Sequence, residues 1–281
     1  SINGFFEMST GGIAQLFGQS NFLIQGQHAS CSSNTRAVRL NGYSPSTAPI
    51  ACNVMEYVTI ATQGRAVDFG VSTRACRYNT GFGSQTRGIN ANGNTPGDVN
   101  AIDYITIAST GDATNFGDLD SFTGTLAGST SNSIRGLISG YTPGNNHTEY
   151  VTIATTGNGQ TFGEATVAMQ GRKGAASSTR ALFASGYSQP TFNVINTIDY
   201  FTISTLGNAV DFGDLTVATG GAGGTSDSVR AVFMGGFLNP GSTNVIDVVT
   251  IATTGNATRF GDMYEAQSTA DAAASDCHGG L

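Results

Sequence analysis

Ten charged residues recur at fixed places along the chain and could act together. Five arginines each open an apolar run, namely Arg36, Arg87, Arg135, Arg180 and Arg230. Five carboxylates each stand just before an aromatic residue or a Val in the next run, namely Glu56, Asp103, Glu149, Asp199 and Asp247. If the repeats close into a ring, five guanidinium groups at one mouth of a central channel would hold an anion or an acidic sugar.

The same residues also have a structural interpretation, in which each arginine pairs with a carboxylate of its own repeat or of the next one. We favour the pairing because a partly buried guanidinium without a partner costs free energy. Counting residues along the hairpin weakens the case for a direct pair between its two strands. With a loop centred near Gly144, the residue opposite Arg135 is nearer Ile153 than Glu149.

Residues that commonly catalyse reactions show no such regularity. The three histidines, His28, His147 and His278, are not periodic and share no motif with Cys, Asp or Glu. The chain contains no Gly-x-Ser-x-Gly, His-Glu-x-x-His or phosphate-loop motif. Asp118 and Asp120 are the closest pair of carboxylates and are interpreted as part of a turn. We therefore expect no catalytic residue and no cofactor.

The four cysteines are interpreted as free, half-buried thiols. They are Cys31, Cys52, Cys76 and Cys277. They fall at four different places within the repeat, and none forms a Cys-x-x-Cys pair. A zinc site or a repeated disulfide framework would show regular spacing, so we expect no metal site.

A second pattern identifies the elements that carry these residues. A glycine, four further residues and a Phe-Gly pair occur six times, with the phenylalanines at Phe17, Phe69, Phe116, Phe162, Phe212 and Phe260. Successive phenylalanines are 46 to 52 residues apart, a period typical of repeat architectures. We expect these rings to pack between neighbouring repeats, each contributing about 1.5–3 kcal/mol by apolar burial. The glycine after each would let the neighbouring backbone pass closely.

Composition agrees with many short strands and tight turns. Of 281 residues 39 are Gly, none is Trp, and 11 % are charged, against about 25 % in an average domain. The net charge of -7 argues against a nucleic-acid partner, because such binding depends on clustered Lys and Arg. No apolar stretch approaches the ~20 residues of a membrane helix, and the start, SINGFFEMST, does not resemble a signal peptide. We expect neither nucleic-acid binding nor membrane insertion.

One repeat, residues 214–261, predicts four short antiparallel strands. The two strongest are VRAVFMGGF (229–237) and NVIDVVTIA (244–252), joined by a loop of variable length. A third, ATRFG, follows a glycine that suits a hairpin turn, and a fourth lies around LTVATGG. The stretch GGAGGTSD (220–227) is interpreted as a turn. Such a sheet cannot bury both faces alone and must stack on its neighbours, as in one blade of a propeller.

Counting repeats predicts a single domain, residues 1–281, folded as an all-β, six-bladed propeller with four-stranded antiparallel blades. Five blades are whole, at residues 19–70, 71–117, 118–163, 164–213 and 214–261. The sixth combines 262–281 with 1–18, because FFEMSTGGIAQLFG (5–18) aligns without gaps on YFTISTLGNAVDFG (200–213). Gly279 and Gly4 take the places of the arginine and the carboxylate there. This last blade would close the ring by using both termini.

The composite blade is about ten residues shorter than the others. Three explanations remain open. Its missing strand is short, or residues before Ser1 in a longer natural chain complete it, or a neighbouring subunit lends a strand in a homo-oligomer.

The apolar runs resemble the kelch repeat, in which an inner strand ends in Gly-Gly or Gly-aromatic and "Asn-x-Ile-Asp-Tyr" follows. The relevant segments are AVFMGGF (231–237), ALFASGY (181–187), GLISGY (136–141) and AVRLNGY (37–43). One copy keeps the double glycine, and Phe stands where kelch blades commonly use Trp. A nearer resemblance is to repeats of the form IDYVTIATTGNATDFGDLT in virion proteins of tailed phages, especially those of marine cyanobacteria. It covers nearly the whole chain, including the SDCHGGL end.

This resemblance implies a non-enzymatic propeller of the virion, in the tail or capsid, assembled in the host cytoplasm. Its expected partners are other virion proteins and a host-surface glycan, bound through the variable loops NPGST, QPTFN, PGNN and SPSTAP. The alternative is a carbohydrate-processing enzyme that carries acidic residues on the same loops. Such an enzyme would need two carboxylates about 5–10 Å apart in one pocket.

Overall fold

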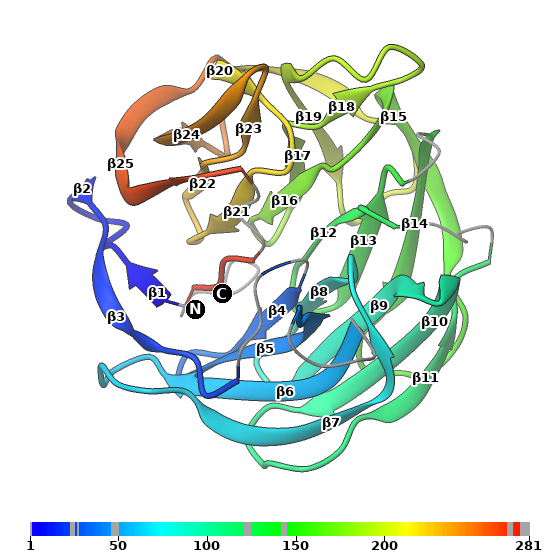
Figure 1. Ribbon diagram of the computed structural model, residues 1–281. Coiled ribbons are helices and arrows are strands. Elements are labelled where there is room, and N and C mark those ends of the chain that lie inside the picture. Colours follow the sequence, from blue (N-terminus) through cyan, green and yellow to red (C-terminus); the bar gives the residue numbers. More distant parts are fainter. Residues whose placement is uncertain are drawn as a thin grey trace.

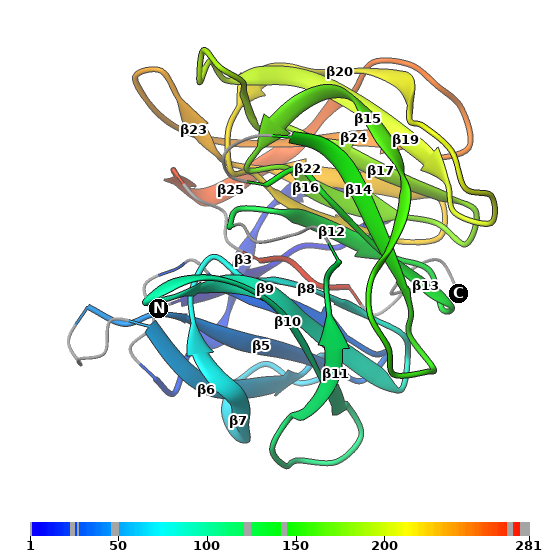
Figure 2. The ribbon, with the colours of Figure 1, turned by 90° about the vertical axis from the view of Figure 1, so that its right-hand side faces the viewer.

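The chain folds as a β-propeller of five four-stranded blades. The computed structural model describes residues 2–22, 26, 28–45, 51–120, 125–141, 145–268 and 272–275. Every regular element in these residues is a β-strand, and each blade is an antiparallel sheet (Figure 1). Figure 2 shows the blades from the side, arranged around one axis. The prediction of an all-β propeller with four-stranded blades is confirmed for these five blades.

Each blade runs from an innermost strand at the axis to an outermost strand at the rim. Blade 1 consists of β4 (Ala29–Ser32), β5 (Arg36–Tyr43), β6 (Ala51–Thr59) and β7 (Val67–Cys76). Blade 2 consists of β8 (Thr80–Gly83), β9 (Arg87–Thr95), β10 (Gly97–Thr106) and β11 (Thr114–Asp118). Blade 3 consists of β12 (Gly128–Ser131), β13 (Arg135–Ser139), β14 (Asn145–Thr152) and β15 (Gln160–Gln170).

The last two whole blades follow the same plan. Blade 4 consists of β16 (Lys173–Ala176), β17 (Arg180–Ala184), β19 (Ile195–Thr202) and β20 (Val210–Thr219). Blade 5 consists of β21 (Gly223–Ser226), β22 (Arg230–Met234), β24 (Gly241–Thr250) and β25 (Thr258–Gln267). Two short strands, β18 (Tyr187–Ser188) and β23 (Phe237–Leu238), pair with β15 and β24.

The innermost strands correct the predicted strand order. The run VRAVFMGGF was predicted to be the inner strand, but it contains the second strand β22, and the innermost strand β21 lies within the segment interpreted as a turn. Glycine is rare in strands by propensity. Here it is required, because innermost strands of neighbouring blades pack backbone against backbone. A Cβ atom on Gly81 or Gly174 would come within 2.6 or 2.5 Å of a main-chain oxygen of the preceding blade.

The outermost strand also differs from the prediction. The two segments predicted as separate strands, of the types ATRFG and LTVATGG, belong to one continuous strand that bends at a bulge after its Phe-Gly pair. Each predicted blade boundary therefore falls inside an outermost strand. In β20, for example, the boundary after Gly213 divides a strand that runs from Val210 to Thr219.

Neighbouring blades meet at a seam formed by the two glycines of the repeated pattern. Between blades 3 and 4, the Gly207 amide donates to the Phe162 carbonyl at 3.0 Å. A Cβ atom on Gly163 would lie 2.1 Å from the Gly207 oxygen. Gly207 itself has φ +151°, a conformation that favours glycine. A Cβ atom would meet the facing glycine in the same way at Gly18, Gly70, Gly117, Gly213 and Gly261.

A side-chain amide or carboxylate caps four of these seams. Its Oδ1 accepts the amide hydrogen that follows the Phe-Gly pair of the preceding blade, at 3.0–3.1 Å. The capping residues are Asp112, Asn158, Asn208 and Asn256. The equivalent positions in the two seams that flank the N-terminal strands are Ile13 and Arg65.

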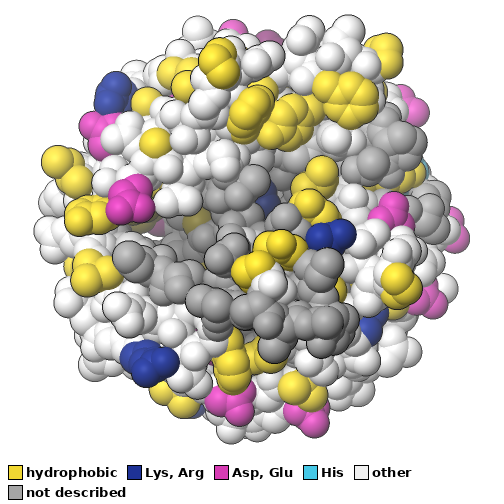
Figure 3. All heavy atoms as spheres, viewed as in Figure 1, with side chains coloured by type: hydrophobic (Ala, Val, Ile, Leu, Met, Phe, Trp, Pro, Cys, Tyr) yellow, Lys and Arg dark blue, Asp and Glu magenta, His cyan; other side chains and the backbone are white. Residues whose placement is uncertain are grey.

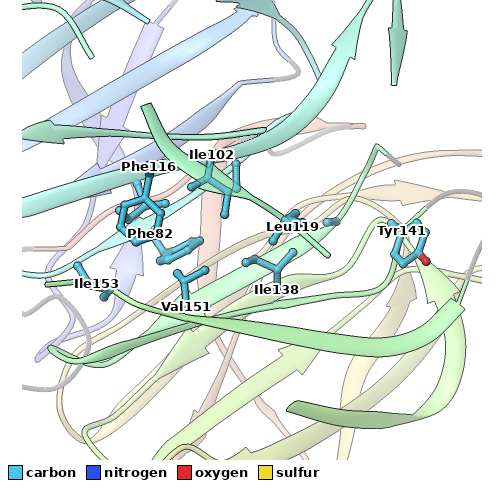
Figure 4. Packing of buried hydrophobic residues seen from close by; sticks show 11 residues of the cluster. Phe82, Ile102, Phe116, Leu119, Ile138, Tyr141, Val151 and Ile153 are labelled. Atoms are coloured by element: carbon cyan, nitrogen blue, oxygen red, sulfur yellow. The ribbon is translucent and has the colours of Figure 1, made fainter. Parts of the chain in front are cut away.

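The repeated phenylalanines lie beside the seams and are part of the core. Phe69, Phe116, Phe162 and Phe212 are 2–3 % exposed. Figure 4 shows Phe116 of blade 2 in one cluster with Val151 and Ile153 of blade 3. The other three rings also pack with residues of the following blade. Phe17 and Phe260 are half-buried.

The N-terminal residues form a small sheet next to the five blades. β1 (Ile2–Phe5) pairs antiparallel with β3 (Gln15–Gln19), and β2 (Gly12–Ile13) pairs parallel with β25 of blade 5. Among the described residues this sheet has two strands rather than four.

The seam predicts a steric effect that can be measured directly. We expect Gly163→Ala to lower the free energy of unfolding by about 1–3 kcal/mol, the usual cost of overpacking, because the methyl group would meet the Gly207 backbone. Gly97→Ala is the matched control, since nothing lies within 4 Å of a Cβ atom there. It should change stability by less than about 0.5 kcal/mol in urea unfolding. Equal stabilities of the two variants would contradict the seam contact.

Candidate functional site

The five repeated arginines begin the second strands of the blades, and four of them contact the next blade. The Arg87 guanidinium donates to the Ile153 carbonyl at 2.8 Å, and its Cζ lies 4.3 Å from the centre of the Tyr104 ring. Arg36, Arg135 and Arg180 make the same two contacts. In blade 5 the tyrosine position is Val248, and Arg230 instead contacts Asp227 at 3.5 Å. Four of the five arginines therefore link blades, and none of the five pairs with a repeated carboxylate.

The five repeated carboxylates are buried and also link blades. Glu56, Asp103, Glu149, Asp199 and Asp247 are 0–3 % exposed. Each accepts hydrogen bonds from the chain that follows the Phe-Gly pair of the preceding outermost strand. Asp199, for example, accepts from both the amide and the hydroxyl of Thr166, at 3.0 and 2.8 Å. A carboxylate held in this way is not available to act on a substrate.

Three of these carboxylates pair with arginines that stand outside the repeat. Arg39 lies 2.6 Å from Glu56, Arg74 lies 3.1 Å from Asp103, and the fully buried Arg172 contacts Asp199. The sequence prediction missed these partners because they occupy a different place in each blade. The sequence does contain a signal for them. Only 11 % of the residues are charged, so an arginine that does not follow the repeat indicates a buried partner of its own.

The innermost strands leave little space at the axis. Serine hydroxyls bridge neighbouring strands, as in Ser131 to the Gly83 carbonyl at 2.7 Å and Ser226 to the Ala176 carbonyl at 2.7 Å. The cavity between the strands measures about 50 Å³ and is lined by Gly, Ala, Ser, Thr, Cys and Phe side chains. Small-molecule sites usually measure about 300–1,000 Å³. Among the described residues, this cavity can hold water molecules but is too small for a sugar ring.

A second axial cavity, of about 40 Å³, is lined partly by His28 and Lys173. Burial and the nearby charges of Arg39 and Lys173 lower the pKa of His28 to about 3. This imidazole is therefore neutral at physiological pH. His147 lies 3.9 Å from Glu149, and His278 lies outside the described residues.

Hydrophobic side chains gather on the face seen in Figure 3, over β18 and β23. This loop face carries the connections between the second and third strands of the blades. Phe192 is 60 % exposed, and the rings of Tyr187 and Phe237 lie 6.3 Å apart. The loop is held by its own hydrogen bonds: the Phe192 amide donates to the Ser188 carbonyl at 2.7 Å, and the Ser188 amide donates to the Asn193 carbonyl at 2.9 Å. Sequence analysis had singled out this loop, QPTFN, without its aromatic neighbours.

The remaining candidates that the structure describes do not assemble into a metal site. Within the part of the chain that the structure describes, no three His, Cys, Asp or Glu side chains come together as metal ligands. Asp118 ends β11, and the Asp120 amide donates to Glu149 at 2.9 Å. Cys31, Cys52 and Cys76 are free thiols, and Cys277 lies outside the described residues. In that same part of the chain, no helix has the length and apolar character of a membrane span.

Comparison with known proteins adds no assignment. The sequence matches no protein-family model, and a search of curated proteins found no match.

The buried carboxylates predict losses of stability of very different size for the same substitution at equivalent positions. We expect Asp199→Asn to lower the free energy of unfolding by about 3–5 kcal/mol, because the Arg172 charge stays buried without its counter-charge. Asp247→Asn should change it by less than about 1 kcal/mol at pH 7, because its hydrogen bonds come from Thr216. Urea unfolding of both variants gives the comparison, and a large loss in both would contradict it.

The Asp247 variant should also differ from wild type in its pH dependence. Burial raises the pKa of Asp247 above its ordinary value of 3.8, although the Thr216 hydrogen bonds and Arg259 act in the opposite direction. The folded protein then holds the Asp247 proton more tightly than the unfolded chain does. The contribution of Asp247 to wild-type stability therefore falls as pH rises from the pKa of the unfolded chain to the raised pKa of the folded protein. The stability of Asp247→Asn relative to wild type should increase as pH is raised above about 4.

Proposed function

We propose that the ring has a sixth blade, made by both ends of the chain. Contacts of residues 272–275 with blades 1 and 5 support this. The Ser275 hydroxyl donates to the Ser226 carbonyl at 2.5 Å, and the Ser32 hydroxyl donates to the Ser275 carbonyl at 2.8 Å. These are the same bridges that join innermost strands elsewhere around the axis. In this proposal residues 272–275 occupy the position of the innermost strand of the sixth blade.

The N-terminal sheet supports the same proposal. The pairing of β1 with β3 has the register and the bulge of β19 with β20: Phe5 faces Gln15 as Tyr200 faces Val210. The Gly64 amide donates to the Phe17 carbonyl at 3.2 Å, and the Ala14 amide donates to the Asp262 carbonyl at 3.0 Å. The Phe6 and Phe260 rings meet edge to face at 5.6 Å. In this proposal β1 and β3 are the third and fourth strands of the composite blade.

Closure can be tested with the glycines of the two seams that join the N-terminal sheet to blades 1 and 5, because only a closed ring forms both seams at once. We expect Gly18→Ala and Gly261→Ala to destabilise the protein as Gly163→Ala does, because a Cβ atom would lie 1.8 Å from the Gly64 oxygen and 2.0 Å from the Gly12 oxygen. Urea unfolding measures both effects. If these two variants kept wild-type stability while Gly163→Ala lost it, the ring would be open.

We propose that the protein is a non-enzymatic propeller of a phage virion that binds a host-surface glycan on its loop face. The proposed binding surface rests on Phe192, which is 60 % exposed on a hydrogen-bonded loop that follows Tyr187, a residue whose ring lies near that of Phe237. Virion setting and partnership with other virion proteins rest on the resemblance of the repeats to those of tailed phages. The blades provide a rigid scaffold, and loops on such scaffolds commonly carry the binding residues.

The chemistry of these loops favours a carbohydrate. An aromatic ring packs against the apolar face of a sugar, while amides and hydroxyls bind its hydroxyl groups. The segments 187–193 and 237–243 contain Gln189, Asn193 and Asn239 together with serines and threonines, and no charged residue. This composition suits a neutral sugar. The axial cavity, with about 50 Å³, is too small for a sugar, which favours the loop face over the axis.

A glycan array tests the proposal. We expect the wild-type protein to bind a subset of neutral oligosaccharides and Phe192→Ala to bind them at least about tenfold more weakly, the loss of about 1.4 kcal/mol. Tyr264→Ala is the matched control, since Tyr264 is 72 % exposed and lies on the outermost strand β25. It should bind like wild type.

The same sugars, incubated with the protein and assayed for new reducing ends, separate binding from turnover. Release of reducing ends would support the enzyme alternative. Absence of binding by wild type to every glycan would contradict glycan recognition. Undiminished binding by Phe192→Ala would move the site away from this loop.

A further inference from the structure

Two of the cysteines lie opposite each other in blade 1. Cys52 of β6 and Cys76 of β7 are directly paired residues of antiparallel strands. Such residues have Cα atoms about 4.5–5.5 Å apart, and disulfides form over Cα distances of about 4.4–6.8 Å. Side chains of directly paired residues point to the same face of the sheet. The backbone therefore already has a spacing that a disulfide requires.

The two sulfur atoms contact consecutive residues of β5. The Cys52 thiol donates to the Gly42 carbonyl at 3.3 Å, and the Cys76 sulfur accepts a hydrogen bond from the Asn41 side-chain amide at 2.7 Å. Asn41 and Gly42 are consecutive residues of β5. Both sulfurs thus contact the same short piece of the neighbouring strand. Nothing in the repeat requires this, because the equivalent pairs in other blades are Asn145 with Met169 and Ile195 with Thr219.

We propose that Cys52 and Cys76 form a disulfide when the protein meets a small-molecule disulfide such as glutathione disulfide. The Cys52 thiolate attacks one sulfur of glutathione disulfide, and one glutathione leaves as a thiolate that takes up a proton. The Cys76 thiolate then attacks the Cys52 sulfur of the mixed disulfide, and the second glutathione leaves in the same way. The two protein thiols are oxidised and one glutathione disulfide is reduced to two glutathione molecules.

Accessibility sets the order of the two steps. Cys52 is partly exposed, whereas Cys76 is fully buried, so the small disulfide can reach Cys52 first. Burial raises the pKa of both thiols, that of Cys76 to about 11, so the thiolates are scarce at neutral pH and the exchange is slow. The third cysteine of the described residues, Cys31, is buried in β4 with a pKa raised by burial to about 12. It is not a directly paired neighbour of either residue.

The bond would fasten the outermost strand of blade 1 to its third strand. Cys76 is the last residue of β7 and lies against blade 2, where a Cβ atom on Gly93 would come within 3.1 Å of the Cys76 Cβ atom. A crosslink there constrains the unfolded chain between residues 52 and 76, so the oxidised protein should unfold at a higher temperature than the reduced one.

Mass spectrometry tests the pairing on the full chain. The protein is reduced, freed of reductant, incubated with glutathione disulfide at pH 8, alkylated under denaturing conditions and digested with trypsin. We expect a linked pair of peptides, 40–65 with 75–77, because cleavage follows Arg39, Arg65, Arg74 and Arg77. The mass of the linked pair should be two hydrogen atoms less than the sum of the two unalkylated peptides. Dithiothreitol should separate the pair and return the melting temperature to that of the reduced protein.

Single substitutions distinguish this pairing from other thiol reactions. Cys76→Ser should keep glutathione bound to Cys52, Cys52→Ser should leave Cys76 reduced, and Cys31→Ser should form the linked pair as wild type does. A lasting glutathione adduct on Cys52 in wild type, a link from Cys52 to Cys277, or unreacted Cys52 and Cys76 would each overturn the proposal.

Discussion

The contact of backbone with backbone between neighbouring blades governs the rest of this structure. At each seam a glycine of one outermost strand faces a glycine of the next blade, and main-chain hydrogen bonds join the two. No side chain separates them, so the backbone itself sets the distance between blades. The preceding phenylalanine then faces the narrow space between two sheets and becomes buried. One constraint thus accounts for both the glycines and the aromatic ring of the repeated pattern.

Polar residues serve the same purpose deeper in the blades. Four of the repeated arginines cross to carbonyl oxygens of the following blade, and the repeated carboxylates accept hydrogen bonds from the preceding one. Blades 1–4 are therefore tied in both directions by charged groups, of which the buried carboxylates remain hydrogen-bonded. A low fraction of charged residues is compatible with this arrangement, since about two per blade are enough for these links.

The features that recur in every repeat could be predicted from the sequence, whereas the features that depend on packing between blades could not. The period, the four-stranded blades and the burial of Phe69 follow from apolar spacing. The innermost strand around Gly224 was missed because glycine has a low strand propensity and only the close approach of another backbone makes it necessary. The partners of Arg135 could not be predicted either, because a main-chain carbonyl and a tyrosine ring leave no charge pattern in the sequence. At the loop face, exposure of Phe192 depends on a turn between Ser188 and Asn193 whose main-chain hydrogen bonds leave no pattern in the sequence.

The links between blades are unevenly distributed, and the departures coincide at the proposed composite blade. Gly4 stands where the other blades have a carboxylate, Ile13 and Arg65 replace the capping residues, and Phe17 and Phe260 are half-buried. Arg230 contacts Asp227 of its own blade because Val248 offers no aromatic ring. Backbone contacts persist at both seams, and the seam with blade 1 keeps the hydrogen bonds that Glu56 accepts from Asn21 and Phe22. Among the described residues neither seam has the capping side chain found at the other four, so we expect the ring to open beside β1 and β3 before any seam among blades 1–5 separates.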